Sequence, residues 1–158
     1  MKKLFNLILT LALLSLTTAA FAQNGGGSAD YKGPGTLNVG LTSGFGNYLG
    51  VGADYEFNLA QDFTVGPSVE FNSWNNYEGK DYTAFAIGAR FRWYADRVLK
   101  ITHPKWDVFA NGNIGFNING PDGLWWGLGI GGKFHISDSF GLQAIIGSGA
   151  QIGVTFQL

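Results

Sequence analysis

Residues 82–94 read YTAFAIGARFRWY, and alternate side chains fall on two dissimilar faces. One face is mostly apolar and ends at Trp93, whereas the other is small or polar and carries Arg90 and Arg92. A period of two predicts a β-strand, because successive side chains leave a strand on opposite sides. About ten tilted residues are enough to cross the hydrocarbon of a bilayer. A long strand with one apolar and one charged face predicts a transmembrane β-barrel, whose lining is more polar than its exterior.

Seven further segments alternate in the same way, so the chain is predicted to hold eight strands. Most connections are short and rich in Gly, Asn, Asp and Ser, as turns are, and the longest and least periodic is 95–105. Pro67 interrupts one segment, and since proline cannot donate a ladder hydrogen bond we expect an edge or a bulge there. The predicted fold is an all-β, eight-stranded antiparallel up-and-down transmembrane β-barrel over 36–158. The seven further strands are expected at 36–43, 48–59, 63–74, 106–118, 124–136, 140–146 and 150–158.

The N-terminal residues have the pattern of a signal peptide over 1–22. Lys2 and Lys3 precede an apolar run that is short for the roughly 20 residues of a spanning helix, and an Ala-Phe-Ala cleavage site ends at Ala22. We expect 23–35, QNGGGSADYKGPG, to be a flexible periplasmic tail. An even number of strands places the start of the first strand and the end of the last strand on one side of the membrane, which is the periplasmic side in a bacterial outer membrane.

Charge and cysteine content exclude several classes of function. Without Lys2 and Lys3 the chain has eight basic and eleven acidic residues, a net charge of −3, so nucleic acid is not expected as a partner. The chain has no Cys, which excludes disulfides and thiolate metal sites. His135 stands alone among the predicted strands, without the cluster that a metal site needs. No metal and no other cofactor is predicted.

Inward positions of the predicted strands carry a nearly balanced set of ionisable residues. The interior of an eight-stranded barrel is just wide enough for side chains to fill, so the balance favours a packed, charge-paired lumen over a pore that selects one sign of ion. Inward glycines of 124–136 would make room for larger lumen residues such as Tyr94, Phe109 and Trp125. The predicted lumen charge network consists of Asp54, Glu56, Glu70, Arg90, Arg92, Asp107, Lys133 and His135.

Two tight connections predict a register for this interior. If Trp74 lies opposite Tyr82, then Gly66 is level with an arginine of 82–94. If Leu59 lies opposite Phe63, then Gly66 is also level with an inward glutamate of 48–59.

That glutamate is Glu56 and that arginine is Arg90, so the register favours an ion pair between them across Gly66. A second pair is expected between Arg92 and Asp107. Such charges must satisfy one another, because an unpaired charge in a confined interior is costly. The pairs could form a gate or a structural plug, and we favour the plug.

Outward aromatic side chains gather near the predicted periplasmic rim, as in the aromatic girdle of a membrane interface. Trp126, with Phe71 and Phe116, would supply a sparser girdle at the outer rim. The rim set consists of Tyr55, Phe57, Phe63, Phe91, Trp93, Trp106, Phe134, Phe140 and Phe156.

With its signal peptide, eight alternating strands and final segment GVTFQL at 153–158, the chain resembles the small outer-membrane β-barrel family typified by OmpA and OmpX. The family's last strand usually ends in an aromatic residue, whereas here Leu158 is last and Phe156 precedes it by two. The resemblance implies a bacterial outer-membrane location and a lumen closed by Glu–Arg pairs, here drawn from Glu56, Glu70, Arg90 and Arg92. Expected partners are outer-membrane lipid, lipopolysaccharide and the barrel-assembly machinery, and the protein is expected to be a monomer.

The predicted function is that of an integral outer-membrane barrel, structural or weakly pore-forming, and not an enzyme. One alternative is a soluble secreted barrel that binds an apolar ligand, as lipocalins do, but such a barrel would carry its large apolar residues inside. Another is an outer-membrane lipid-modifying enzyme. That reading would need His103 beside a serine and a carboxylate at the membrane edge.

Overall fold

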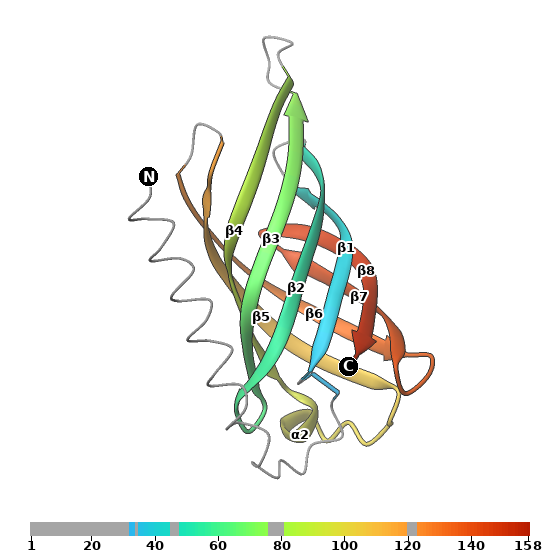
Figure 1. The fold of residues 1–158 in the computed structure, drawn as a ribbon. Helices are drawn as coiled ribbons and strands as arrows, with labels where there is room; N and C mark the ends of the chain where they lie inside the picture. The colour runs from blue at the N-terminus through green and yellow to red at the C-terminus, as the bar shows by residue number, and fades with distance from the viewer. Residues whose placement is uncertain (1–31, 34, 45–47, 76–80, 120–122) are drawn as a thin grey trace.

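A computed structural model describes residues 32–33, 35–44, 48–75, 81–119 and 123–158 of the 158-residue chain. The predicted signal peptide and most of the predicted tail lie outside the described residues. The described chain is a closed barrel in which each strand pairs antiparallel with the next and the last pairs with the first (Figure 1). Its strands are β1 (Thr36–Gly44), β2 (Tyr48–Ala60), β3 (Phe63–Asn75), β4 (Asp81–Tyr94), β5 (Trp106–Asn117), β6 (Leu124–His135), β7 (Phe140–Gly147) and β8 (Gly149–Gln157).

The predicted fold class is confirmed, and every predicted strand boundary agrees with the structure to within one residue. The 95–105 connection contains a short helix that the sequence did not predict, α2 (Asp96–Leu99). Its C-cap is Lys100, which adopts a left-handed conformation with φ of 54°. Among the described residues, no helix is long and apolar enough to span a bilayer.

The strands separate a polar interior from an apolar exterior. Inward side chains such as Asn38, Thr64 and Thr155 are fully buried. Outward side chains such as Trp126 and Ile152 are 70% and 72% exposed. This arrangement inverts that of a soluble protein, where large apolar side chains are the ones most often buried.

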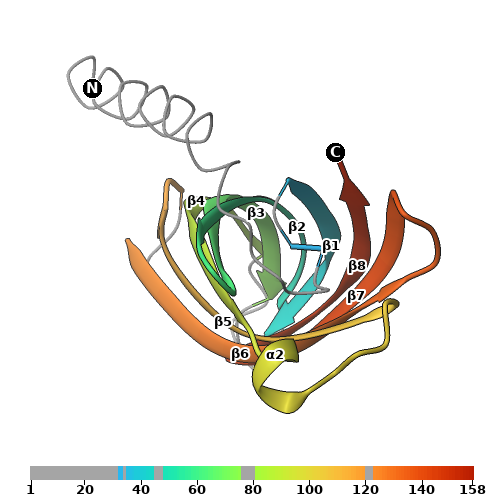
Figure 2. The same ribbon diagram turned by 90° about the horizontal axis from the view of Figure 1, so that it is seen from below.

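The two ends of the barrel differ. At one end, which we call the proximal end, lie β1 residue Thr36, its partner Gln157 on β8, the β2–β3 turn and α2. Viewed from this end, the strands surround the lumen and α2 lies at its rim (Figure 2). We call the opposite end distal. There β6 extends to Leu124, although its pairing with β7 begins only at Gly129.

The β3–β4 register is as predicted, with Trp74 opposite Tyr82. The predicted pairing of Leu59 with Phe63 is wrong by one residue, because Ala60 is the partner of Phe63. The register shifts between Asn58 and Ala60, and the tight turn that follows includes a residue with positive φ, Asp62 at 64°. A bulge of this kind is a common way to fit a tight hairpin turn to a twisted ladder.

β3 continues through Pro67, which pairs with Ala89 of β4. On the other side, the β2–β3 ladder is interrupted at Gly66 and Pro67. The carbonyl oxygen of Tyr55 occupies the place where a Cβ of residue 66 would lie. Glycine is therefore required at this close approach, since any side chain would collide with main chain.

Candidate functional site: a charge network in the lumen

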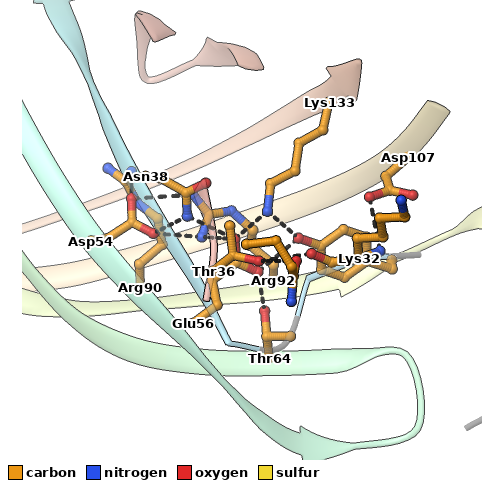
Figure 3. A network of polar contacts seen from close by, with 12 residues as sticks. Lys32, Thr36, Asn38, Asp54, Glu56, Thr64, Arg90, Arg92, Asp107 and Lys133 are labelled. Atoms are coloured by element: carbon orange, nitrogen blue, oxygen red, sulfur yellow. Dashed lines mark hydrogen bonds and ion pairs between the residues drawn. The ribbon is translucent and has the colours of Figure 1, made fainter. Parts of the chain in front are cut away.

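Five buried ionisable side chains from three strands meet inside the proximal half of the barrel (Figure 3). Asp54 and Glu56 lie two residues apart on β2, and Arg90 and Arg92 are similarly spaced on β4, so each pair shares the inward face. Lys133 enters from β6. Strand periodicity alone therefore places all five side chains in the lumen.

Asp54 is bound by two arginines. Arg90 Nη1 lies 2.6 Å from Asp54 Oδ1, and Arg92 Nη1 lies 2.7 Å from Oδ2. Asn38 Nδ2 donates a further hydrogen bond of 2.9 Å to Oδ2. Hydrogen bonds between charged partners are roughly twice as strong as neutral ones, so Asp54 is firmly fixed.

Glu56 accepts hydrogen bonds from side chains around the lumen. Arg92 Nη1 lies 3.0 Å from its Oε1, and Lys133 Nζ also binds Oε1. Thr64 Oγ1 and Tyr94 Oη donate to Oε2 at 2.9 Å and 2.7 Å. Lys133 Nζ also donates to the Tyr94 hydroxyl at 2.8 Å. These bonds link strands β2, β3, β4 and β6 through one carboxylate.

The predicted ion pairs are wrong in detail. Arg90 binds Asp54 rather than Glu56, and Arg92 bridges Asp54 and Glu56 rather than binding Asp107. Gly66 does pair with Arg90, as the predicted register required. However, strands in a closed barrel are tilted and staggered, so residues that are level along a ladder differ in height along the barrel axis.

Asp107 belongs to a second cluster, at the proximal mouth. His135 Nε2 lies 2.8 Å from Asp107 Oδ2, and the main-chain N–H of Lys32 donates to the same oxygen at 3.1 Å. Thr36 Oγ1 donates to the Lys32 carbonyl at 2.7 Å. Lys32, four residues before β1, is thus held against the inner wall at this mouth.

Aromatic rings pack against the network. Tyr94 and Phe109 lie 5.5 Å apart between ring centroids, and the guanidinium of Arg92 is 5.1 Å from the Phe109 centroid. A Cβ on Gly131 would lie 2.6 Å from the Phe109 ring. The interpretation that inward glycines of the sixth strand make room for lumen aromatics is confirmed at Gly131.

Glu70 lies apart from both clusters. It is only half-buried and lines a cavity in the distal half of the lumen, beside Asn72 and Thr42. The eight residues expected to form one network therefore occupy three places, of which the group around Asp54 and Glu56 is the largest.

The predicted rim aromatics face outward and contact one another in pairs, apart from Trp93, which lies opposite Phe63 in the β3–β4 ladder. Trp126 lies near the distal end of β6. The ring contacts are Tyr55–Phe57 at 4.6 Å, Phe63–Phe91 at 5.5 Å, Trp106–Phe134 at 4.9 Å and Phe140–Phe156 at 5.5 Å.

α2 and the β2–β3 turn meet at the proximal rim. Arg97 Nε and Nη2 donate to Asp62 Oδ2 at 2.8 Å and 2.5 Å. The main-chain N–H of Val108 donates to Asp96 Oδ1 at 3.0 Å, while Asp96 Oδ2 is buried and has no partner within the described part of the chain. Burial raises the pKa of Asp96 from its ordinary 3.8 to about 6.

Alternation along their strands puts Asn38, Thr64 and Tyr94 on the inward face, but it did not assign them to the carboxylates that they bind. The signal available was their inward position on strands that flank Glu56. His103, the residue on which an enzymatic reading depended, is exposed, and its Nδ1 accepts a hydrogen bond of 3.3 Å from the Lys105 N–H. Within the described ranges, no three His, Cys, Asp or Glu side chains are grouped to hold a metal ion.

Comparison with solved structures bears on the fold. A structure from work on the de novo design of transmembrane β-barrels aligns with a TM-score of 0.55 at 14% identity, covering 79% of this chain and 97% of the designed chain. The fold is that of a transmembrane β-barrel. The outer-membrane protein Ail of Yersinia pestis, solved in a phospholipid bilayer nanodisc, aligns with a TM-score of 0.47 at 13% identity over 78% of this chain and 97% of Ail. No protein-family model and no curated protein sequence matches the chain.

Proposed function

We propose that this protein is an integral β-barrel of the bacterial outer membrane, structural or weakly conducting, with a lumen plugged in its proximal half. It would be inserted as a monomer by the barrel-assembly machinery and surrounded by outer-membrane lipid and lipopolysaccharide. The observation that carries the proposal is the inverted polarity of the closed barrel, which is apolar outside and charged inside.

Several features of the exterior support a membrane location. Large apolar side chains on every strand are more than a third exposed, among them Leu41, Val51, Phe116, Ile130 and Ile146. Monomeric soluble proteins rarely expose a continuous apolar surface of this extent. Paired aromatic rings lie toward the proximal end, as expected at a membrane interface. A soluble lipocalin-like barrel would have the opposite polarity.

The plug is supported by the burial of the network. Glu56, Arg92 and Lys133 are each no more than 1% exposed, and so are the rings of Tyr94 and Phe109 that pack beside them. These side chains extend from β2, β4, β5 and β6, so they approach the lumen axis from several sides. A gate would need an alternative set of partners for these charges, whereas the observed contacts pair them with one another.

The first test is insertion. The chain from Gln23 onward, refolded from urea into phospholipid vesicles, should become protease-resistant and migrate differently on gels with and without heating. It should also resist extraction from vesicles by alkaline carbonate. A folded, monodisperse barrel in detergent-free buffer that leaves vesicles unoccupied would contradict the proposal.

A further inference from the structure

The distal half of the lumen holds a cavity of about 360 Å³, which lies within the range of about 300–1,000 Å³ that small-molecule sites occupy. Its polar lining is rich in amides rather than charges. The residues that matter for recognition are Asn72, Asn111, Asn113, Asn117, Trp125 and Gln151. An amide side chain offers both hydrogen-bond donors and an acceptor, so this lining matches ligands that also offer both.

Three of these side chains hold buried polar atoms that have no partner among the residues that the structure describes. They are Asn111 Oδ1, Trp125 Nε1 and Gln151 Nε2. Asn111 and Gln151 are 6% and 4% exposed, so their side chains are more than nine-tenths buried. Their other polar atoms are used, because Asn111 Nδ2 donates to Asn113 at 3.3 Å and Gln151 Oε1 accepts from Arg90 at 2.7 Å. These atoms have almost no accessible surface, so a ligand would meet them only once the side chains turn toward the cavity. Since a buried polar atom left unpaired is costly, a polar ligand would then supply the missing partner.

The indole of Trp125 is placed by its neighbour across the β5–β6 ladder. Trp125 pairs with Gly115, and a Cβ at Gly115 would lie 2.9 Å from the indole ring. The absence of a side chain at Gly115 therefore lets the indole pack directly against the wall. An aromatic face held in this way can stack against the apolar face of a flat ligand.

The charges at the cavity balance. Arg90 lines it but already binds Asp54, and Glu70 lines it beside Asn72. One cation and one anion face the space, which gives no preference for a charged ligand of either sign.

The cavity reaches the barrel surface at the distal end of β6. Trp126 and Leu128 face outward and yet contribute to its lining, together with Ser148 from the β7–β8 turn. β6 continues to Leu124 where β7 has already ended, so the wall is incomplete beside the lining. A ligand can enter here without passing the buried network.

We propose that the distal cavity binds a neutral saccharide, with the sugar ring stacked on Trp125 and its hydroxyl groups bound by Asn111, Asn113 and Gln151. The sugar could be free in the external medium or could be the headgroup of a glycolipid, because both present the same ring. This inference goes beyond the proposed function, and binding measured in detergent does not depend on conductance or membrane insertion.

The test uses ligand-observed saturation-transfer NMR on the barrel refolded in a zwitterionic detergent that carries no sugar. The probes are glucose, galactose, maltose and lactose, with glucuronate and glucosamine as charged counterparts. At least one neutral sugar should give saturable transfer, and the charged counterparts should bind more weakly. If no neutral sugar gives transfer to wild-type protein, the proposal is overturned.

Variants locate the binding. Trp125→Leu, and separately Asn111→Leu, should weaken the binding of the sugar by at least tenfold. The matched controls are Trp106→Leu, on the outer face near the proximal end, and Asn119→Leu, exposed beyond β5. Both should bind as wild type does. Heat-shifted gel mobility identifies folded variants, and Asn111→Leu, which is close in volume, covers the case in which Trp125→Leu does not fold. Equal losses of sugar binding in the variants and in the controls would exclude the cavity as the binding site.

A competition experiment separates the two sources of the sugar. Nanodiscs with and without monogalactosyl diacylglycerol are loaded with the barrel, and free galactose is titrated. If the glycolipid displaces galactose, the headgroup is a ligand of the cavity. If it does not, the cavity takes the free sugar.

Discussion

Lys133 of β6 binds Glu56 of β2. Since β2 and β6 are four strands apart in a ring of eight, this contact crosses the lumen. Both side chains are at most 1% exposed. A contact between opposite walls ties the barrel together through its interior, in addition to the ladders that run around it.

Loss of one partner of this contact should destabilise the barrel. Lys133→Met should lower the free energy of unfolding in urea by about 3 kcal/mol, since it leaves Glu56 with one cationic partner instead of two. Combined with Glu56→Gln, the loss should be smaller than the sum of the single losses by about 1–3 kcal/mol. Lys105→Met, an exposed control, should change stability by less than about 0.5 kcal/mol. Additive losses would show that the contact contributes no coupling.

Removal of Arg92 should open the plug. Arg92→Ala takes away the guanidinium that bridges Asp54 and Glu56 and leaves a gap between Arg90 and Lys133, which then balance the two carboxylates. In planar bilayers, Arg92→Ala should give discrete openings that are larger than those of wild type. Arg97→Ala, at the rim outside the lumen, should behave as wild type does. Folded Arg92→Ala barrels with wild-type conductance would argue against a plug at this position.

The close approach at Gly66 should make that position intolerant of any side chain. Gly66→Ala would collide with the Tyr55 carbonyl and should destabilise the barrel by about 3 kcal/mol, the upper range for overpacking. Gly132→Ala is the matched control, because its Cβ would meet its nearest atom, the Asp107 carbonyl oxygen, at an ordinary 3.4 Å. Unfolding midpoints in urea compare the two. A similar small effect at both sites would mean that β3 shifts readily at Pro67.

Asp96 should make stability depend on pH. Its pKa of about 6 in the folded state exceeds the ordinary 3.8, so the folded state holds this proton more tightly than the unfolded state does. The stabilisation that this tighter proton binding gives the folded state is fully present below about pH 4 and is lost as pH rises through about 6. Asp96→Asn keeps an oxygen for the Val108 N–H and should be more stable than wild type at pH 7 by up to about 3 kcal/mol.

The gain from Asp96→Asn should disappear at pH 4, where wild-type Asp96 is already protonated in most of the folded molecules. Urea unfolding at the two pH values measures it. Asp138→Asn, at an exposed carboxylate, is the control and should show no gain at pH 7. An equal gain from Asp96→Asn at both pH values would assign the effect to packing rather than to charge.

A charge on the outer wall should be costly only in a membrane. Ile130 lies in the middle of β6 and is 64% exposed, and Ile136 lies just beyond the same strand and is 50% exposed. Ile130→Arg should destabilise the barrel in vesicles by about 2–4 kcal/mol, and Ile136→Arg by about 0–1 kcal/mol, because the cost of a cation depends on depth. If neither arginine substitution changed the stability of the barrel, the outer wall would be exposed to water rather than to lipid.

Strand limits were predictable from sequence because alternation of side chains and turn residues both mark them. Gly120, Pro121 and Gly123, for example, separate two alternating segments. Alternation also assigned Asp54, Glu56 and the arginines to the interior. α2 was not predictable, because a helix of four residues has no periodicity to detect.

The partners within the lumen were not predictable in the same way. Alternation tells which face a residue occupies, whereas the pairing of Arg90 with Asp54 depends on the stagger of the closed barrel and on the reach of long side chains. The bulge that makes Ala60 rather than Leu59 the partner of Phe63 could not be predicted from alternation either, because alternation does not reveal an extra residue in one strand.

The seam between β1 and β8 has a consequence for how the chain folds. Seven ladders join consecutive strands, but this one joins residues as far apart as Thr36 and Gln157, separated by 121 positions. Contacts so distant in sequence carry the largest loop-closure entropy and form slowly. Lys32, which precedes β1, meets Asp107 of β5 on the opposite wall. Ring closure is therefore expected to limit the folding rate.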